Sequence, residues 1–154
     1  PSLTLAYAWG SGDTDLDDDT NKNFRQTDLQ DNNARFNCVT SFKYYGELMD
    51  PELSNMSIWY GGIGLRPAKK TSIDLVYHQY RQVEASDDIR DSDIDTDPSG
   101  MDRDLGRELD LVIGYQEVKN LFTELVVAYF WPGDAFPDDA DNALFAGLQM
   151  RYNF

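Results

Sequence analysis

The chain has 154 residues, a length typical of one domain, and its 28 acidic and 13 basic residues give a formal net charge of −15. This charge argues against nucleic acid as a partner, because a phosphate backbone would be repelled. No segment approaches the roughly 20 consecutive apolar residues of a transmembrane helix. Strands of a transmembrane β-barrel remain compatible with the composition, because only every second residue in them must be apolar.

Six runs of about ten residues alternate between apolar and polar side chains, which is the period-two pattern of a strand with two different faces. In chain order they are Leu3–Trp9, Met56–Arg66, Ser72–Val83, Glu108–Gln116, Leu121–Trp131 and Leu144–Phe154. The pattern predicts an all-β fold, a transmembrane antiparallel β-barrel with lipid outside and an aqueous lumen inside. Only the second run is ambiguous, because its glycines blur the alternation.

The connections between these runs alternate strictly between short and long. Segments 67–70 and 117–120 are four-residue turns that each carry lysine, whereas segments 10–54, 84–105 and 132–142 are long and rich in Asp. This predicts periplasmic turns at one rim and extracellular loops at the other. The strand-like stretch 34–46 cannot then be a seventh span, since it would reverse every later strand. We expect a hairpin above the rim or a segment folded into the lumen.

Four acids lie within the predicted strands, and all four fall on the polar phase: Asp74, Glu108, Asp110 and Glu124. We therefore expect them to line the lumen and to be accessible to water from inside. His78, the only histidine, shares this phase, and no nucleophile motif accompanies it. It is expected to be part of a polar network, and no enzymatic activity is predicted.

Six strands cannot close a barrel, since the smallest transmembrane barrels have about eight and an open edge in hydrocarbon leaves backbone groups unpaired. We expect the chain to be the C-terminal part, residues 1–154, of one larger barrel domain, completed by residues upstream of Pro1 or by another chain. Its last outward residues are apolar and end on an aromatic, which resembles the signal read by the barrel-insertion machinery: Leu148, Met150, Tyr152 and Phe154.

The Asp-rich loops raise the question of calcium. One run starting at Asp13 has the spacing of an EF-hand loop but carries Asp18 where that loop needs Gly and Phe24 where it needs Glu, so it fails. A second run comes nearer, although Thr96 replaces the turn glycine: Asp91, Asp93, Asp95, Asp97 and Asp102. We favour solvated loops that divalent cations bridge to anionic lipid and lipopolysaccharide, with a specific calcium site as the alternative. No cofactor is predicted.

Ordered segments across nearly the whole chain resemble the alginate-export outer-membrane porin family. The matching residues are Ser11-Gly12-Asp13, Asn23-Phe24-Arg25-Gln26-Thr27, Leu29-Gln30, Gly46-Glu47, Glu52-Leu53-Ser54-Asn55, Leu75-Val76-Tyr77-His78, Glu108-Leu109-Asp110-Leu111-Val112 and Pro132-Gly133-Asp134-Ala135. The resemblance implies the last six strands of an 18-stranded barrel that exports an anionic uronate polysaccharide. It also implies that Arg25 and Lys43 draw the anion, while Gln82 stands where the family has arginine and Arg81 lies one residue earlier.

These observations predict a bacterial outer-membrane conduit for an alginate-like polysaccharide or another small polar solute. A structural barrel that sheathes or anchors a partner is the alternative. The residues assigned to the substrate path, in the lumen or at the rim, are Arg25, Lys43, Arg66, Asp74, His78, Gln82, Glu108, Asp110, Glu124 and Arg151.

Overall fold

The computed structural model describes residues 1–14, 19–27, 32–35 and 38–154. Within them the chain forms strands and turns. The strands are β1 (Ser2–Gly10), β2 (Asn33–Ala34), β3 (Phe42–Lys43), β4 (Met56–Ala68), β5 (Thr71–Gln82), β6 (Asp104–Tyr115), β7 (Leu121–Pro132) and β8 (Ala143–Tyr152). In this described part of the chain, no helix has the length and apolar character needed to span a membrane.

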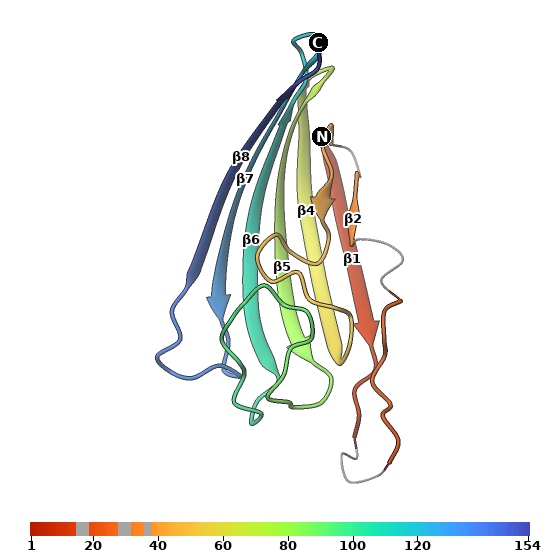
Figure 1. The fold of residues 1–154 in the computed structure, drawn as a ribbon, viewed down its shortest axis with the longest axis vertical. Coiled ribbons are helices and arrows are strands. Elements are labelled where there is room, and N and C mark those ends of the chain that lie inside the picture. Colours follow the sequence, from red (N-terminus) through yellow and green to blue (C-terminus); the bar gives the residue numbers. More distant parts are fainter. Residues whose placement is uncertain (15–18, 28–31, 36–37) are drawn as a thin grey trace.

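Six of these strands form one antiparallel sheet in the order β1-β4-β5-β6-β7-β8, so each long strand pairs with the next along the chain. The sheet is curved, with the short turns at one end and the long loops at the other (Figure 1). β1 and β8 are its edges, and it does not close on itself. The all-β, antiparallel fold and all six predicted long strands are confirmed. Their bounds shift by a few residues, most at β6, which begins at Asp104 rather than Glu108.

The outward face of the sheet is apolar and exposed, as the alternation predicts. Leu5 is 77 % exposed on β1 and Leu148 is 67 % exposed on β8. Aromatic rings lie outward near both ends of the strands. Near the long loops the rings of Tyr7 and Trp59 are 4.5 Å apart, and Tyr152 lies near the turns. An apolar band between aromatic residues is the arrangement found on lipid-facing barrel walls.

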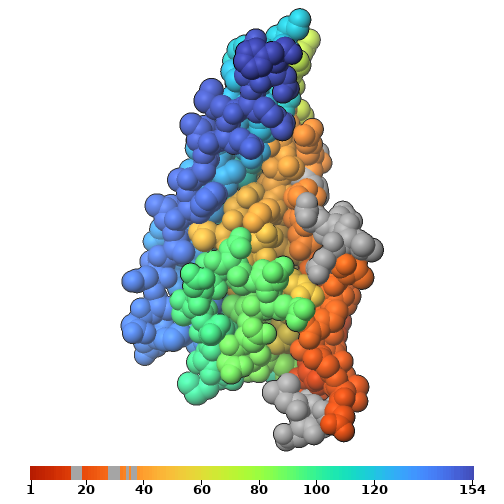
Figure 2. All heavy atoms as spheres, viewed as in Figure 1, coloured from red at the N-terminus to blue at the C-terminus, as the bar shows by residue number. Residues whose placement is uncertain are grey.

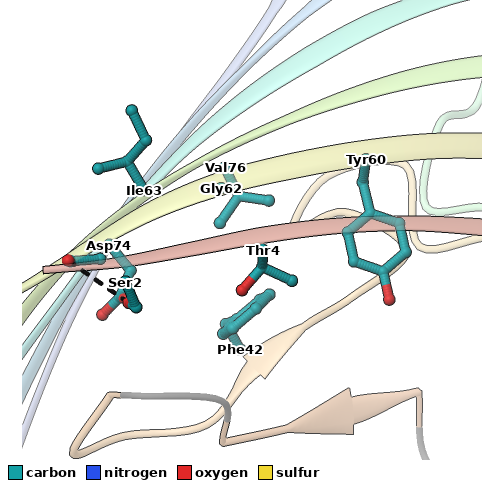
Figure 3. A pocket seen from close by; sticks show the side chains of 9 residues that line it. Ser2, Thr4, Phe42, Tyr60, Gly62, Ile63, Asp74 and Val76 are labelled. Atoms are coloured by element: carbon teal, nitrogen blue, oxygen red, sulfur yellow. Dashed lines mark hydrogen bonds between the residues drawn. The ribbon is translucent and has the colours of Figure 1, made fainter.

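Within the first long loop (11–55), residues 38–55 lie over the inner face of the sheet, and the loop carries the small β2–β3 hairpin (Figure 1). Near the turns, Val39 N donates to Ser72 Oγ at 3.0 Å, and Gln116 Nε2 donates to Val39 O at 2.9 Å. Phe42 packs near Val76 on the inner side of the sheet (Figure 3). Of the two outcomes expected for segment 34–46, the structure therefore shows residues 38–46 folded against the inner wall, whereas residues 36–37 lie outside the described part.

The second long loop, residues 83–103, covers the same face nearer the loop end. In the space-filling view it lies together with the first long loop in front of the strands (Figure 2). The larger buried cluster forms beneath these loops, from inward residues of the strands and from residues of the loops: Met49, Met56, Ile58, Tyr80, Leu105, Phe130, Ala135 and Phe136. The hydrophobic core of this chain thus lies between the inner wall and its own loops.

Candidate functional site

The inner wall carries a row of buried polar side chains at mid-height on β5 and β6. His78 is paired in register with Glu108, and Val76 with Asp110. Because side chains alternate along a strand, these residues all face the concave side. His78, Glu108 and Asp110 are each 0 % exposed. Burial this complete favours hydrogen-bond partners for the polar atoms, and the first long loop supplies them for both Glu108 oxygens and for Asp110 Oδ2. Both His78 nitrogens and Asp110 Oδ1 have no hydrogen-bond partner among the described residues.

Glu108 binds the backbone of the docking segment, by which we mean residues 43–50 of the first long loop. Leu48 N donates to its Oε1 at 2.8 Å and Met49 N donates to its Oε2 at 2.9 Å. The Tyr80 hydroxyl lies 3.2 Å from Oε2 and 2.9 Å from the carbonyl oxygen of Tyr45. Glu108 thus anchors the loop to the wall through two backbone N–H groups and the Tyr80 hydroxyl.

Asp110 makes the second contact with the docking segment. Glu47 N donates to its Oδ2 at 3.3 Å. His78 Nδ1 lies 3.4 Å from the same oxygen, without hydrogen-bond geometry. The imidazole is stacked between two tyrosine rings, with its centroid 5.6 Å from that of Tyr60 and 5.8 Å from that of Tyr80. His78 is therefore a packed element of the wall.

The docking segment turns at Gly46, whose φ of 105° is a left-handed conformation that favours glycine. A Cβ atom at this position would collide with the Tyr80 hydroxyl and come within 3.0 Å of both Glu108 carboxylate oxygens. The glycine thus allows the backbone to approach the wall closely enough for the hydrogen bonds to Glu108. Gly46 and Tyr80 were missed as site residues, although Gly46-Glu47 was among the segments that carry the resemblance.

Lys43 joins the first and second long loops. Its Nζ lies 2.6 Å from Asp50 and 3.4 Å from Asp93. Burial opposes the charge on Lys43, but the hydrogen bond and negative charge of Asp50, with those of Asp93, raise its pKa. Burial also raises the pKa of Asp50, although Lys43 acts in the opposite direction. Burial raises the pKa of Glu47 in the same way, with Glu124 and Asp50 adding to it and Lys43 opposing it.

Further polar contacts hold the loops together near the loop end of the strands. Glu52 accepts a hydrogen bond from Gln26 N at 2.7 Å and forms an ion pair with Arg90 of the second long loop. Gln82 is buried, and its side chain donates a hydrogen bond to Asp88 O and accepts one from Ser86 N. Neither Glu52 nor Gln26 was assigned to a site, because nothing local in the sequence indicates which loop segments meet.

The expected water access of the inward acids is wrong for most of them. Glu108 and Asp110 are fully buried and Asp74 is 7 % exposed, whereas Glu124 is half-buried. Their inward direction is as predicted, but the first long loop fills the space in front of them. His78 and Gln82 are covered in the same way.

The basic residues assigned to the substrate path are spread over the whole height of the molecule. Arg25 is exposed in the first long loop, and Lys43 lies in the docking segment. Arg66 is exposed near the turn end of β4, and Arg151 near the end of β8. The structure therefore does not gather these four residues into one site.

The aspartates of the second long loop do not form a metal centre. Among the described residues, no group of three or more His, Cys, Asp or Glu side chains is placed to hold a metal ion. Asp91, Asp93, Asp95, Asp97 and Asp102 all lie in this part of the chain. The calcium alternative consequently has no support from the structure.

Comparison with known proteins agrees with this architecture. The family model described as "Alginate export" matches residues 1–145. The chain is similar to the alginate production protein AlgE of Pseudomonas aeruginosa, with 30 % identity over 157 aligned positions that cover 91 % of this chain and 31 % of AlgE. The chain thus spans about a third of the length of this curated relative. On the strength of the family match over almost its whole length, this chain belongs to the alginate export family.

Proposed function

We propose that this chain is part of the wall of an outer-membrane β-barrel that conducts alginate or a related anionic polysaccharide. The observation that carries the proposal is the two-faced sheet. Its outer face is an exposed apolar band flanked by aromatic rings, its inner face carries buried acids such as Glu108 and Asp110 beside apolar residues that the loops cover, and the chain matches the alginate export family. A wall of this kind suits a barrel in lipid with an aqueous interior.

In this proposal the short turns face the periplasm and the acidic loops face the outside. Of the 28 acidic residues, 22 lie in the three long loops 11–55, 83–103 and 133–142. Carboxylates at this density suit a rim next to lipopolysaccharide, whose anionic groups are bridged by divalent cations. The strands would then be inserted by the barrel-insertion machinery, with the C-terminal pattern of outward apolar residues as its signal.

The first long loop is proposed to narrow the path on this side of the barrel. Glu108 and Asp110 hold the docking segment against the wall through three backbone N–H groups. These buried acids would then bind the loop backbone and would not contact the solute. The polyanion would meet the rim and loop cations, and Arg25 and Lys43 remain proposed contributors there. The role proposed for the chain is passive conduction, with no covalent chemistry.

The test is the conductance of the full-length protein in planar lipid bilayers. We expect an open, ion-selective channel that uronate oligomers block in a concentration-dependent manner. A second expectation is that neutralising Arg25 and Lys43 together weakens anion selectivity, since both side chains carry positive charge near the solute path. Unchanged anion selectivity in that double variant would show that Arg25 and Lys43 do not contribute to the solute path.

A second candidate function is a barrel that sheathes or anchors a partner. The observation that favours it is the occupation of the inner face by the protein's own loops, which shows that this interior accommodates polypeptide. A full-length protein that conducts no ions, and that stays closed to uronate oligomers, would support this candidate against the conduit.

A further inference from the structure

The outer face of the sheet carries two cations, and both lie near the long loops. Arg81 on β5 and Arg107 on β6 are exposed. The other outward positions that pair within the sheet are uncharged, apart from Asp104, which pairs with Arg81. Gln82, the residue after Arg81, is buried on the inner side. Neither arginine therefore belongs to the proposed conduction path.

The two arginines are neighbours at the level of an aromatic row on the outer face. Gln79 pairs with Trp59 on one side and with Arg107 on the other, and Arg107 pairs in turn with Trp131. Arg81 lies two residues beyond Gln79 on the same strand, so it is a diagonal neighbour of Arg107. Diagonal neighbours on one face of a sheet are within reach of long side chains. Both guanidinium groups can therefore approach the same ligand.

Aromatic stacking holds Arg107 against the wall. Its guanidinium carbon lies 5.4 Å from the centroid of the Trp131 ring, and that ring lies 4.5 Å from the ring of Tyr129. A stacked guanidinium keeps the N–H groups at its edge for an acceptor in the plane. Among the described residues, neither Arg107 nor Arg81 forms an ion pair or donates a hydrogen bond.

Two carboxylates lie close to Arg81. The charge of Arg81 acts on Asp102, and Asp104 pairs with Arg81 in the register. Oδ1 of each carboxylate accepts two hydrogen bonds from neighbouring groups, at 2.6 and 2.8 Å for Asp102 and at 3.0 and 3.1 Å for Asp104. These acids offset part of the charge of Arg81 without forming an ion pair with it, so we expect Arg107 to contribute more to an anion site.

A charge on a lipid-facing wall is costly at the middle of the bilayer and much less so at its interface, which aromatic residues mark. The row that contains Trp59 and Trp131 therefore places the two arginines at the level of the lipid headgroups. In the orientation of the proposed function this end faces the outside, where lipopolysaccharide forms the leaflet. Its lipid anchor carries phosphate groups on sugars, and arginine matches phosphate with two parallel N–H donors.

We propose that Arg81 and Arg107 together bind a phosphate group of lipopolysaccharide on the outer face of the wall. The inference rests on the proposed function, because the orientation decides which leaflet these arginines meet. Leu109 and Leu111 continue from Arg107 toward the middle of the outer face and would contact the acyl chains of the same lipid. The contact is direct, and so differs from the divalent bridging proposed for the acidic loops.

The proposal is tested by native mass spectrometry of the full-length protein in detergent micelles, titrated with lipid A, the phosphorylated anchor of lipopolysaccharide. We expect Arg81→Gln/Arg107→Gln to bind lipid A at least about tenfold more weakly than the wild type, because the charge-assisted hydrogen bonds to phosphate are lost. Lipid A without its phosphates should bind the wild type as weakly as intact lipid A binds the variant. Wild-type binding should persist in the presence of a chelator, because arginine needs no bridging cation.

Lys69→Gln/Lys119→Gln is the matched control, because it removes the same charge from exposed residues at the turn end of the sheet. We expect it to bind lipid A within about twofold of the wild type, since charges are screened over about 10 Å at 0.1 M salt. Equal weakening by the two double variants would reduce the effect to net charge and overturn the site. Undiminished binding by the arginine variant would overturn it directly.

Two further outcomes would also overturn the proposal. Loss of wild-type binding on addition of the chelator would assign the lipid to cations bridged by the acidic loops. Displacement of lipid A by an equal concentration of phosphatidylglycerol would assign the arginines to anionic lipids in general. Arg81→Lys/Arg107→Lys keeps both charges but loses the paired N–H donors, so we expect it to bind lipid A with intermediate affinity.

Bilayer recordings separate this site from the proposed function. The arginine variant should conduct ions and be blocked by uronate oligomers like the wild type, because both side chains lie outside the lumen, and its conductance shows that it is folded. A protein that binds lipid A through the two arginines but conducts no ions keeps the site and removes the conduit. A channel that conducts and is blocked, but binds lipid A equally with and without phosphates, keeps the conduit and removes the site.

Discussion

The two faces of the same six strands differ in what covers them. Outward residues such as Leu5 and Leu148 are more than half exposed, and no segment that the structure describes packs over them. Inward residues such as Tyr80 and Glu108 are 0 % exposed, because the long loops fold over them. The outer face is thus complete as an apolar surface for lipid, whereas the inner face is completed by the protein's own loops.

The difference shows that polarity alone does not decide exposure on a barrel wall. The alternation of side chains along β6 directs the polar residues Glu108 and Asp110 inward. They are nevertheless more buried than any leucine of the outer face. The backbone N–H groups of the docking segment replace the water that such carboxylates would otherwise bind. Four predictions, from the largest expected effect to the smallest, test this contrast.

Leu111→Arg should give the largest effect, because it places a charge at the middle of the outward apolar face. We expect the folded protein in bilayers to lose about 2–4 kcal/mol of unfolding free energy, measured by denaturant titration. Gln149→Arg is the control, since Gln149 is an exposed residue of the inward phase on β8. Equal losses in the two variants would mean that the faces do not differ in their surroundings.

Glu108→Ala should release the docking segment from the inner wall. It leaves two loop N–H groups without acceptors, and each such buried group costs about 1–3 kcal/mol. We expect trypsin to cleave after Lys43 about 10–100 times faster in the full-length protein. Glu108→Gln keeps an acceptor oxygen and should be intermediate. Cleavage at exposed Lys22 of the same loop serves as the internal reference, and parallel acceleration at both sites would indicate general unfolding instead.

Gly46→Ala should loosen the same contact from the loop side. The φ of 105° and the collision with Tyr80 should cost about 1–3 kcal/mol, which favours the undocked loop. Gly100→Ala is the matched control, because Gly100 also has a positive φ, of 74°, but lies in the second long loop with space for a Cβ atom. Hydrogen exchange of the amides in segment 43–50 should quicken in the first variant only. Faster exchange of that segment in Gly100→Ala as well would contradict the local contact.

Acidification should strengthen the docking slightly. Burial raises the pKa of Asp50 and Glu47, so the docked state binds their protons more tightly than the free loop does. Their contribution is then fully favourable below their ordinary values and is lost as pH rises through the raised pKa. The charges that face them are those of Lys43, Glu124, Asp91 and Asp93, with Lys43 remaining protonated throughout.

We expect exchange of the amides in segment 43–50 to slow by about twofold more in the wild type than in Asp50→Asn/Glu47→Gln on going from pH 7 to pH 5, after correction for intrinsic rates. Comparison with the double variant isolates these two groups from the wall carboxylates. An equal response in the two proteins would show that their protons are not linked to docking.

Much of the strand framework could be predicted from local pattern. Ile113 and Val112 fall on opposite faces because successive side chains of a strand alternate. The tight turn at Lys69 and Lys70 is too short for a crossover, so the two strands that it joins pair antiparallel. The candidate site was predicted only in part. The inward direction of Glu108 was correct, but Gly46 and Tyr80 were missed, since their roles depend on contacts between residues 28–60 positions apart in the chain.

What the sequence by itself determined is the two-faced wall, its order of strands and the separation of acidic loops from basic turns. These features follow from period-two alternation, connection length and charge, all of which are local properties. Only the tertiary structure decided that the first long loop lies along the inner wall and that its backbone N–H groups bind Glu108 and Asp110. These contacts depend on how closely the turn at Gly46 approaches the Glu108 carboxylate, and the local sequence pattern does not predict that distance.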